Sequence, residues 1–387
     1  MSGYSTTAHC AHVREGGKPL SVGAALRGGV VPRRYAPTVA RNLAAVEILW
    51  GKNSGRGDPV PNACRRWSLR LAVVIPIFGF IFSPAPVWAW GCEGHEAIAI
   101  IAEKHLNPRA LAAANRILQE NPIDPGLSRF CRMEGLDAMA NSSTWADDYR
   151  HTPEGKASGA WHFIDIPRGA ARGDFSRYCP SSSGCITAAL RAQIKILQDA
   201  GAAPGERATA LRFILHFAGE MEQPLHCTNN NDEGAHCFPV EFFDERPTTK
   251  EPAQGEYSPN LHGLWDYEII EREIGHESVA DFAAALDRKY HQQIAAWQNG
   301  AIAIDDWVWE SHQIAEQTAY GLLPRRVAIE TPAPGGTCAD DNHIAARMLE
   351  LHERLDRGYQ SAAVPVIEEQ LAKGGAHLAL VLNHVWP

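Results

Sequence analysis

Apolar residues recur at helical spacing along most of the chain from residue 90 onward, and this periodicity constrains the fold more than any other feature. No run of comparable length alternates between apolar and polar residues, as a half-buried strand does. The sequence therefore predicts an all-α fold, a single helical-bundle domain over residues 90–387 with ligand sites between facing helices. The helices are expected at residues 95–105, 186–198, 207–222, 261–274, 279–298, 305–322, 344–372 and 376–385.

Clusters of Pro, Gly, Asn and Asp interrupt this helical pattern and predict long loops between the helices. These residue types favour turns and end helices, so their clusters separate the periodic segments. The loops are expected at residues 121–128, 167–184, 227–260 and 331–342.

The formal net charge of -9 is unevenly distributed along the chain. Residues 1–89 contain 11 Lys and Arg against 3 Asp and Glu, which leaves 25 basic and 42 acidic residues from position 90 onward, a net charge of -17. Such an acidic body repels polyanions, so an extended basic surface for nucleic acid is disfavoured. Bound metal ions could reverse the field locally.

The segment 65–89 has the pattern of a cleaved secretory signal peptide. Three arginines precede the apolar run at 71–82, and Val87, Trp88 and Ala89 form a small-x-Ala cleavage pattern. Twelve apolar residues fall short of the about 20 that a membrane-spanning helix needs. We therefore expect cleavage after Ala89, no stable membrane insertion after processing, and a periplasmic or secreted protein.

Residues 1–64, which precede the signal pattern, are rich in Gly, Pro and Arg and show no sustained period. A signal peptide normally begins a chain, so these residues are expected to be an unstructured extension or the result of a misassigned translation start.

Export places the seven cysteines of the body in an oxidising compartment, where they can form disulfides. Cys179 with Cys185, and Cys227 with Cys237, could each close a local loop, and a third pair among the others would leave one free thiol. Buried, unpaired cysteines are the alternative. A zinc–thiolate site is not expected because the usual CxxC spacing is missing.

Residues 216–226, HFAGEMEQPLH, have the spacing of metal ligands. His216 and Glu220 are four apart on a predicted helix, so their side chains leave one face and can bind the same cation. Pro224 ends that helix, and His226 follows the break. A second pair with the same spacing, His262 and Asp266, occurs in NLHGLWD.

Further candidate ligands are Asp147 in STWADDYR, His162 in WHFID and His95 in WGCEGHE. Imidazole and carboxylate ligands without thiolate suit a catalytic Zn²⁺ site. A single histidine on an apolar helix face is more often a packing residue than a ligand. Two pairs at ligand spacing nevertheless indicate a metalloprotein.

Five motifs in order, WGxxGH, WADDYR, WHFID, HFAGEMEQPLH and NLHGLWD, resemble those of the S1/P1 nuclease family, and the resemblance extends to AKGGAHLALVLN near the C-terminus. It implies an all-helical fold and a zinc-dependent endonuclease that acts on single-stranded DNA and RNA, with 3′-nucleotidase activity. The related zinc phospholipase C enzymes share the trinuclear plan and are the alternative. A catalytically inactive, metal-stabilised binding protein is a second alternative.

The resemblance also implies three zinc ions and their ligands. One ion would be held by Asp147, His162, His216 and Glu220, a second by the Trp90 amine and carbonyl with His95 and Glu220, and a third by His226, His262 and Asp266. The Trp90 amine becomes a ligand only after cleavage, so export and activation would be coupled.

Catalytic and substrate-binding roles follow from the same resemblance. Asp147 would both bind metal and orient the attacking water, while Arg150 would contact phosphate, to which a guanidinium can bind in a bidentate manner. Phe163 would stack on a base and Asp165 would accept a hydrogen bond from the edge of that base.

The chain departs from the family pattern at three places. Glu220 replaces an Asp, Glu222 replaces a His, and the loop NNNDEGAHC lacks a Gly-Gly-Asn run. A glutamate reaches one methylene further than aspartate, so metal spacing could change. Four further histidines have no carboxylate at a ligand spacing that the family supports and are expected to be surface or packing residues: His105, His236, His312 and His377.

Overall fold

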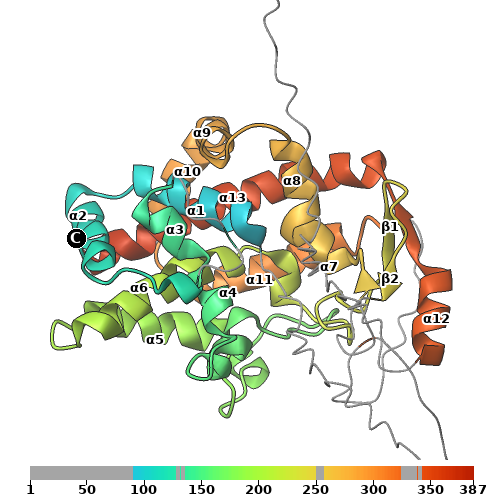
Figure 1. The fold of residues 1–387 in the computed structure, drawn as a ribbon, viewed down its shortest axis with the longest axis horizontal. Helices are drawn as coiled ribbons and strands as arrows, with labels where there is room; N and C mark the ends of the chain where they lie inside the picture. The colour runs from blue at the N-terminus through green and yellow to red at the C-terminus, as the bar shows by residue number, and fades with distance from the viewer. Residues whose placement is uncertain (1–89, 128–130, 132–135, 250–256, 324–337, 339–341) are drawn as a thin grey trace, which may run out of the picture. The chain divides into compact units, whose positions relative to one another are not determined.

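A computed structural model of the chain shows a helical architecture, as the periodicity predicts (Figure 1). The expected leader lies outside the residues that the structure describes. Those residues are 90–127, 131, 136–249, 257–323, 338 and 342–387.

The first part of the fold consists of α-helices joined by short turns of 3₁₀ helix, which carry the label η. In chain order these are α1 (Gly91–Lys104), α2 (Pro108–Glu120), η1 (Pro125–Leu127), α3 (Ala138–Ser143), α4 (Trp145–Tyr149), η2 (Lys156–His162), η3 (Phe175–Tyr178), α5 (Ile186–Gln198), α6 (Pro204–Glu220) and η4 (Pro224–Cys227).

The second part adds short strands and two π-helical stretches, η5 and η6. It comprises β1 (Val240–Phe242), β2 (Thr248–Thr249), β3 (Tyr257–Ser258), α7 (Leu261–Gly263), η5 (Leu264–Glu268), α8 (Ile269–Ile274), α9 (Val279–Lys289), α10 (His291–Gln298), α11 (Ile304–Ile314), η6 (Ala315–Ala319), α12 (Asn342–Leu351), β4 (Glu353–Leu355) and α13 (Arg357–Val385).

Helix α13 forms the centre of the core and packs along α1, α6 and α10 (Figure 1). Its middle is buried on all sides, which explains why the segment 371–382 is apolar almost throughout. Gly374 and Gly375 let α1 approach closely, because a Cβ added at Gly375 would lie 2.5 Å from Ile101 Cγ2. Among the helices of the described part, none combines the length and apolarity needed to cross a bilayer.

The observed elements differ from the expected ones mainly at their boundaries. The segment 279–298 is two helices, α9 and α10, and α13 joins the expected helix over 376–385 to the end of the preceding one. The expected loop over 227–260 contains strands: β1 pairs in parallel with β4, and β2 pairs antiparallel with β3. Strands of two or three residues are too short to show an alternating pattern, so the sequence analysis missed them.

The disulfides confirm one expected pair and correct the other. Cys179 and Cys185 are bonded, but Cys237 pairs with Cys338, 101 residues away, and not with Cys227. A third bond joins Cys92 on α1 to Cys131. Cys227 is a buried thiol at the end of η4, and its Sγ lies 3.4 Å from the carbonyl oxygen of Met221. Closeness in sequence therefore did not decide the partner of Cys237.

The close approach of α1 and α13 leads to a first prediction. Gly375→Ala should lower the free energy of unfolding by about 1–3 kcal/mol, because the new methyl group overlaps Ile101. Gly205→Ala is the matched control, since a Cβ there has no neighbour within 4 Å and α6 should tolerate it. Chemical denaturation of both variants measures the difference, and equal effects would contradict the packing described here.

Candidate metal centre

Helix α6 carries the first pair of candidate ligands into the middle of the bundle. Pro204 occupies its first turn, where no backbone N–H donor is needed, and Glu206 accepts a hydrogen bond from the N–H of Ala203. The last two turns of α6 are buried throughout, so the side chains of His216 and Glu220 are shielded from bulk water.

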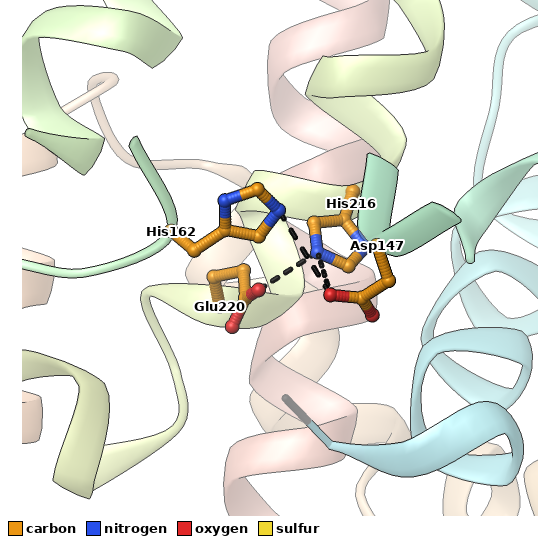
Figure 2. A group of neighbouring side chains, drawn as sticks. All are labelled: Asp147, His162, His216 and Glu220. Atoms are coloured by element: carbon orange, nitrogen blue, oxygen red, sulfur yellow. Dashed lines mark ion pairs between the residues drawn. The ribbon is translucent and has the colours of Figure 1, made fainter. Parts of the chain in front are cut away.

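Four buried side chains from three elements converge at the end of α6 (Figure 2). Their ligand atoms all lie within 4.8 Å of one another. His216 Nε2 lies 2.7 Å from Glu220 Oε1 and 3.8 Å from Asp147 Oδ1. Asp147 comes from α4, and His162, at the end of η2, places its Nε2 3.9 Å from the same Asp147 oxygen. We call these four residues the first cluster.

Backbone carbonyls orient both imidazoles of the first cluster. Nδ1 of His216 donates to the carbonyl oxygen of Ser143 at 2.7 Å, and Nδ1 of His162 donates to that of Ser158 at 2.9 Å. Each ring therefore turns its Nε2 lone pair toward the centre of the cluster. Metal-binding histidines use this arrangement, in which the second ring nitrogen is held by a hydrogen bond.

The first cluster fits a cation because its inward-facing atoms crowd together at ion-pair distances and, within the described residues, form no hydrogen bond of good geometry. These buried atoms are Asp147 Oδ1, the Nε2 atoms of His162 and His216, and both carboxylate oxygens of Glu220. Groups of this kind are costly to bury unpaired, and a bound metal ion would satisfy all of them. Burial also lowers the pKa of His162 well below its ordinary value, which keeps the ring neutral and able to bind metal.

A second cluster consists of His226, His262 and Asp266, all buried. The two Nε2 atoms of His226 and His262 face each other at 3.0 Å, and His262 Nε2 lies 3.0 Å from Asp266 Oδ2. His262 is in α7, and Asp266 is in the π-helical stretch η5, which follows directly. Nδ1 of His262 donates to the carbonyl of Gly234 at 2.6 Å, so its Nε2 also points inward.

Trp90 and His95 lie against the same turn of α6 but belong to neither cluster. The ring of His95 is fully buried and stacks on His216 with 4.1 Å between centroids, and among the residues that the structure describes neither of its nitrogens has a hydrogen-bond partner. The indole Nε1 of Trp90 donates to the carbonyl of Gly219 at 2.7 Å. Gly219 also makes room for the His95 ring, because a Cβ there would lie 3.0 Å from His95 Nδ1.

A cavity of about 310 Å³ opens onto both clusters, and His162, His226 and His262 line it. The predicted substrate residues Arg150, Phe163 and Asp165 line the same cavity. Arg150 places a guanidinium nitrogen 3.1 Å from Asp147 Oδ1. Phe163 is 39% exposed, so part of its side chain is accessible from the cavity that it lines.

The loop between Asn229 and Cys237 supplies cavity residues that the sequence analysis missed: Asn229, Glu233, Gly234 and His236. His236, expected to be a surface or packing residue, stacks on His262 with 3.6 Å between ring centroids. The loop contains a run of positive φ angles, including Gly234 at +61°, where a Cβ would lie 2.7 Å from the carbonyl oxygen of Leu225. The glycine in NNNDEGAHC was the one available signal.

Glu222, one of the departures from the family pattern, points away from the cavity. Its carboxylate lies 2.7 Å from Nδ1 of His377 and accepts a hydrogen bond from Gln370 at 3.1 Å, both on α13. His377 also stacks on Trp307 at 4.0 Å between centroids. Glu222 therefore ties the turn between α6 and η4 to α13, and it belongs to neither metal cluster.

The other two histidines that were set aside also lie outside the clusters. His105 is half-buried, and its Nε2 is 2.6 Å from a carboxylate oxygen of Asp287. His312 is buried and donates from Nδ1 to the carbonyl of Cys227 at 3.2 Å. Both contacts are those of packing residues.

The sequence is similar to a family of known nucleases along the whole part of the chain that forms this fold. A family model described as S1/P1 Nuclease matches residues 90–387. Nuclease P1 from Penicillium citrinum is 29% identical over 306 residues, which cover 76% of this chain and 97% of that protein. Nuclease S1 from Aspergillus oryzae is 26% identical over 307 residues, with 76% and 91% covered. Endonuclease 4 from Arabidopsis thaliana is 24% identical over 349 residues, with 84% and 96% covered.

The unpartnered ligand atoms lead to a prediction on metal removal. Chelation should lower the melting temperature, and added Zn²⁺ at 100 times its dissociation constant should restore about 2.7 kcal/mol for each site that binds only the folded protein. Differential scanning calorimetry with metal analysis checks this. Mg²⁺ is the control, because imidazole-rich sites favour zinc over magnesium. An unchanged melting temperature after complete chelation would contradict the assignment of the clusters.

Proposed function

Since the chain belongs to the S1/P1 nuclease family and is therefore a phosphodiester hydrolase acting on nucleic acid, we propose that it is an exported, zinc-dependent endonuclease for single-stranded DNA and RNA, with 3′-nucleotidase activity. The observation that carries this proposal is that both clusters and an exposed aromatic ring, Phe163, share one cavity. Metal ligands in the same cavity as Phe163, the base platform, suit cleavage next to a stacked base.

Three zinc ions are proposed, with ligands from the two clusters and from the start of α1. Bound zinc lowers the pKa of water and neutralises charge on phosphoryl oxygens. The ligand sets are Asp147, His162, His216 and Glu220 for the first ion, Trp90, His95 and Glu220 for the second, and His226, His262 and Asp266 for the third.

Arg150 and Asp147 act together on the reacting group. The Arg150 guanidinium binds a non-bridging phosphate oxygen, and its contact with Asp147 keeps it directed into the cavity. The Asp147 carboxylate, held by this contact, orients the attacking water. Burial raises the pKa of Asp147, while Arg150 opposes this effect and favours the charged form that the role requires.

Phe163 and Asp165 select an unpaired base. Stacking on an aromatic ring is worth about 1–3 kcal/mol per base and tolerates every base, but it requires a base face that a duplex hides. Asp165 is held in place by Asn229, whose Nδ2 donates to it at 2.9 Å, and accepts a hydrogen bond from the edge of the stacked base. Single strands are therefore the proposed substrates.

Export and processing complete the proposed site. Removal of the leader after Ala89 would free the amine of Trp90, the residue that caps the start of α1, and the first turns of that helix carry His95. The three disulfides are consistent with an oxidising compartment, such as the periplasm or the extracellular space.

The proposal predicts a clear order of substrates. Zinc-loaded protein, purified after export, should cleave denatured DNA and RNA, release phosphate from 3′-mononucleotides, and act more slowly on duplex DNA. Phosphatidylcholine tests the phospholipase alternative, and the base platform predicts that it is not turned over. Preference for the lipid, or no turnover of nucleic acid by fully loaded protein, would overturn the proposal.

Asp147→Asn provides the variant test. We expect a loss of about 100-fold or more in kcat, because both a ligand charge and the partner of Arg150 are removed, with the fold retained. Circular dichroism and turnover of single-stranded DNA measure the two properties. Asp199→Asn, at the exposed end of α5, is the control and should behave as wild type. Full activity of Asp147→Asn would refute the role given to this residue.

A further inference from the structure

Because the body of this protein is acidic, a polynucleotide that crosses its surface needs positively charged side chains along its path. Residues from position 90 onward carry a net charge of -17, and Arg150 inside the cavity already faces Asp147. Directly after the base platform, the segment 167–178 contains three exposed arginines: Arg168, Arg172 and Arg177.

The three arginines differ in how far their charge is neutralised. Arg172 forms an ion pair with Asp306 on α11. Arg177 lies over the ring of Tyr178 at 4.5 Å, within η3. Arg168 has no carboxylate within ion-pair distance among the residues that the structure describes. Within the described residues, a carboxylate therefore neutralises Arg172, while the charges of Arg168 and Arg177 stay available to an incoming anion.

The backbone of Arg168 is attached to the wall of the cavity. Its N–H donates to the carbonyl of Asn229 at 3.0 Å, and Pro167 forms a β-bridge with the same residue. Asn229 in turn holds Asp165, and both line the cavity. The position of Arg168 relative to the base platform is thus set by hydrogen bonds of the cavity wall itself.

The guanidinium of Arg168 is preorganised on a fixed aromatic ring. It lies 4.4 Å from the ring centroid of Tyr320, which is buried and whose hydroxyl is 3.0 Å from each carboxylate oxygen of Asp232. A guanidinium stacked in this way keeps its N–H edges free for a phosphate and loses little rotamer entropy on binding.

Two acidic groups near Arg168 are already occupied. Asp232 is buried and accepts hydrogen bonds from Tyr320 and from the N–H of Ala235. Glu316 accepts from the N–H of Gly169, the residue after Arg168. They lower the local positive potential, but neither forms an ion pair with the guanidinium within the described residues.

We propose that Arg168, stacked on Tyr320, binds a phosphodiester group of the substrate strand next to the one being cleaved. This subsite lies beyond the base platform and makes the enzyme favour polynucleotides over mononucleotides. The inference rests on the proposed function, since it assumes that a single strand enters the cavity beside Phe163. A 3′-mononucleotide carries a single phosphomonoester and no neighbouring phosphate, so it would gain nothing from the contact.

The test compares substrates of two lengths in zinc-loaded, exported Arg168→Gln protein. Loss of one charged contact to phosphate should raise KM for a single-stranded oligonucleotide about tenfold with kcat unchanged, and should leave turnover of a 3′-mononucleotide as in wild type. The dependence of log KM on log salt should become shallower by about 0.7. Arg168→Lys should restore the salt slope and part of the affinity.

Two controls separate binding from structural damage. Arg172→Gln should leave all these quantities unchanged, because Asp306 already neutralises that arginine. The melting temperature of Arg168→Gln should match that of wild type. Equal losses on the oligonucleotide and the mononucleotide, or an unchanged oligonucleotide KM and salt slope, would overturn the proposal.

Binding of a labelled phosphorothioate oligonucleotide measures the same contrast without turnover. Wild-type protein should bind it about tenfold more tightly than Arg168→Gln does. If wild-type protein binds single strands but cleaves none, the proposed function fails while the Arg168 subsite is still measured. If it cleaves single strands and the two proteins bind equally, the subsite alone is refuted.

Discussion

Burial of ionisable side chains at the end of α6 is the constraint on which the rest of the site depends. His216 and Glu220 are fully buried, so their polar atoms must be satisfied by the protein or by a bound cation. Backbone carbonyls accept hydrogen bonds from the Nδ1 atoms of His162 and His216. The Nε2 atoms of both rings face Asp147, and that of His216 also faces Glu220. Metal binding, orientation of the rings and packing of the bundle are therefore aspects of one arrangement.

The elements around this centre serve to bring distant segments to α6. Helix α13 packs on α6 and, through its glycines, on α1, and α1 holds His95 against His216. On the other side, the loop that ends at Cys237 presents the carbonyl of Gly234 to His262. The disulfide between Cys237 and Cys338 anchors the end of that loop. Beside the cavity wall, the chain carries Arg168, which is stacked on Tyr320 and forms no ion pair among the described residues.

Much of the candidate site could be predicted from the sequence because its signals are local. His216 with Glu220, and His262 with Asp266, are helical pairs whose geometry follows from a spacing of four residues. The structure places both pairs in compact clusters, with Asp147 and His162 joining the first and His226 the second. The direction of Glu222 toward His377 could not be predicted, because it depends on α13, which is 155 residues away in the sequence at that contact.

By itself, the sequence determined the helical class, the types of ligand and their pairing along each helix, since periodicity and spacing act within a few turns. Tertiary structure alone decided that Cys237 bonds to Cys338, that His236 enters the cavity, and that Arg168 stacks on Tyr320. These contacts join segments from irregular loops to distant parts of the chain. Their geometry is set by packing around the buried clusters, and no local pattern of residues encodes it.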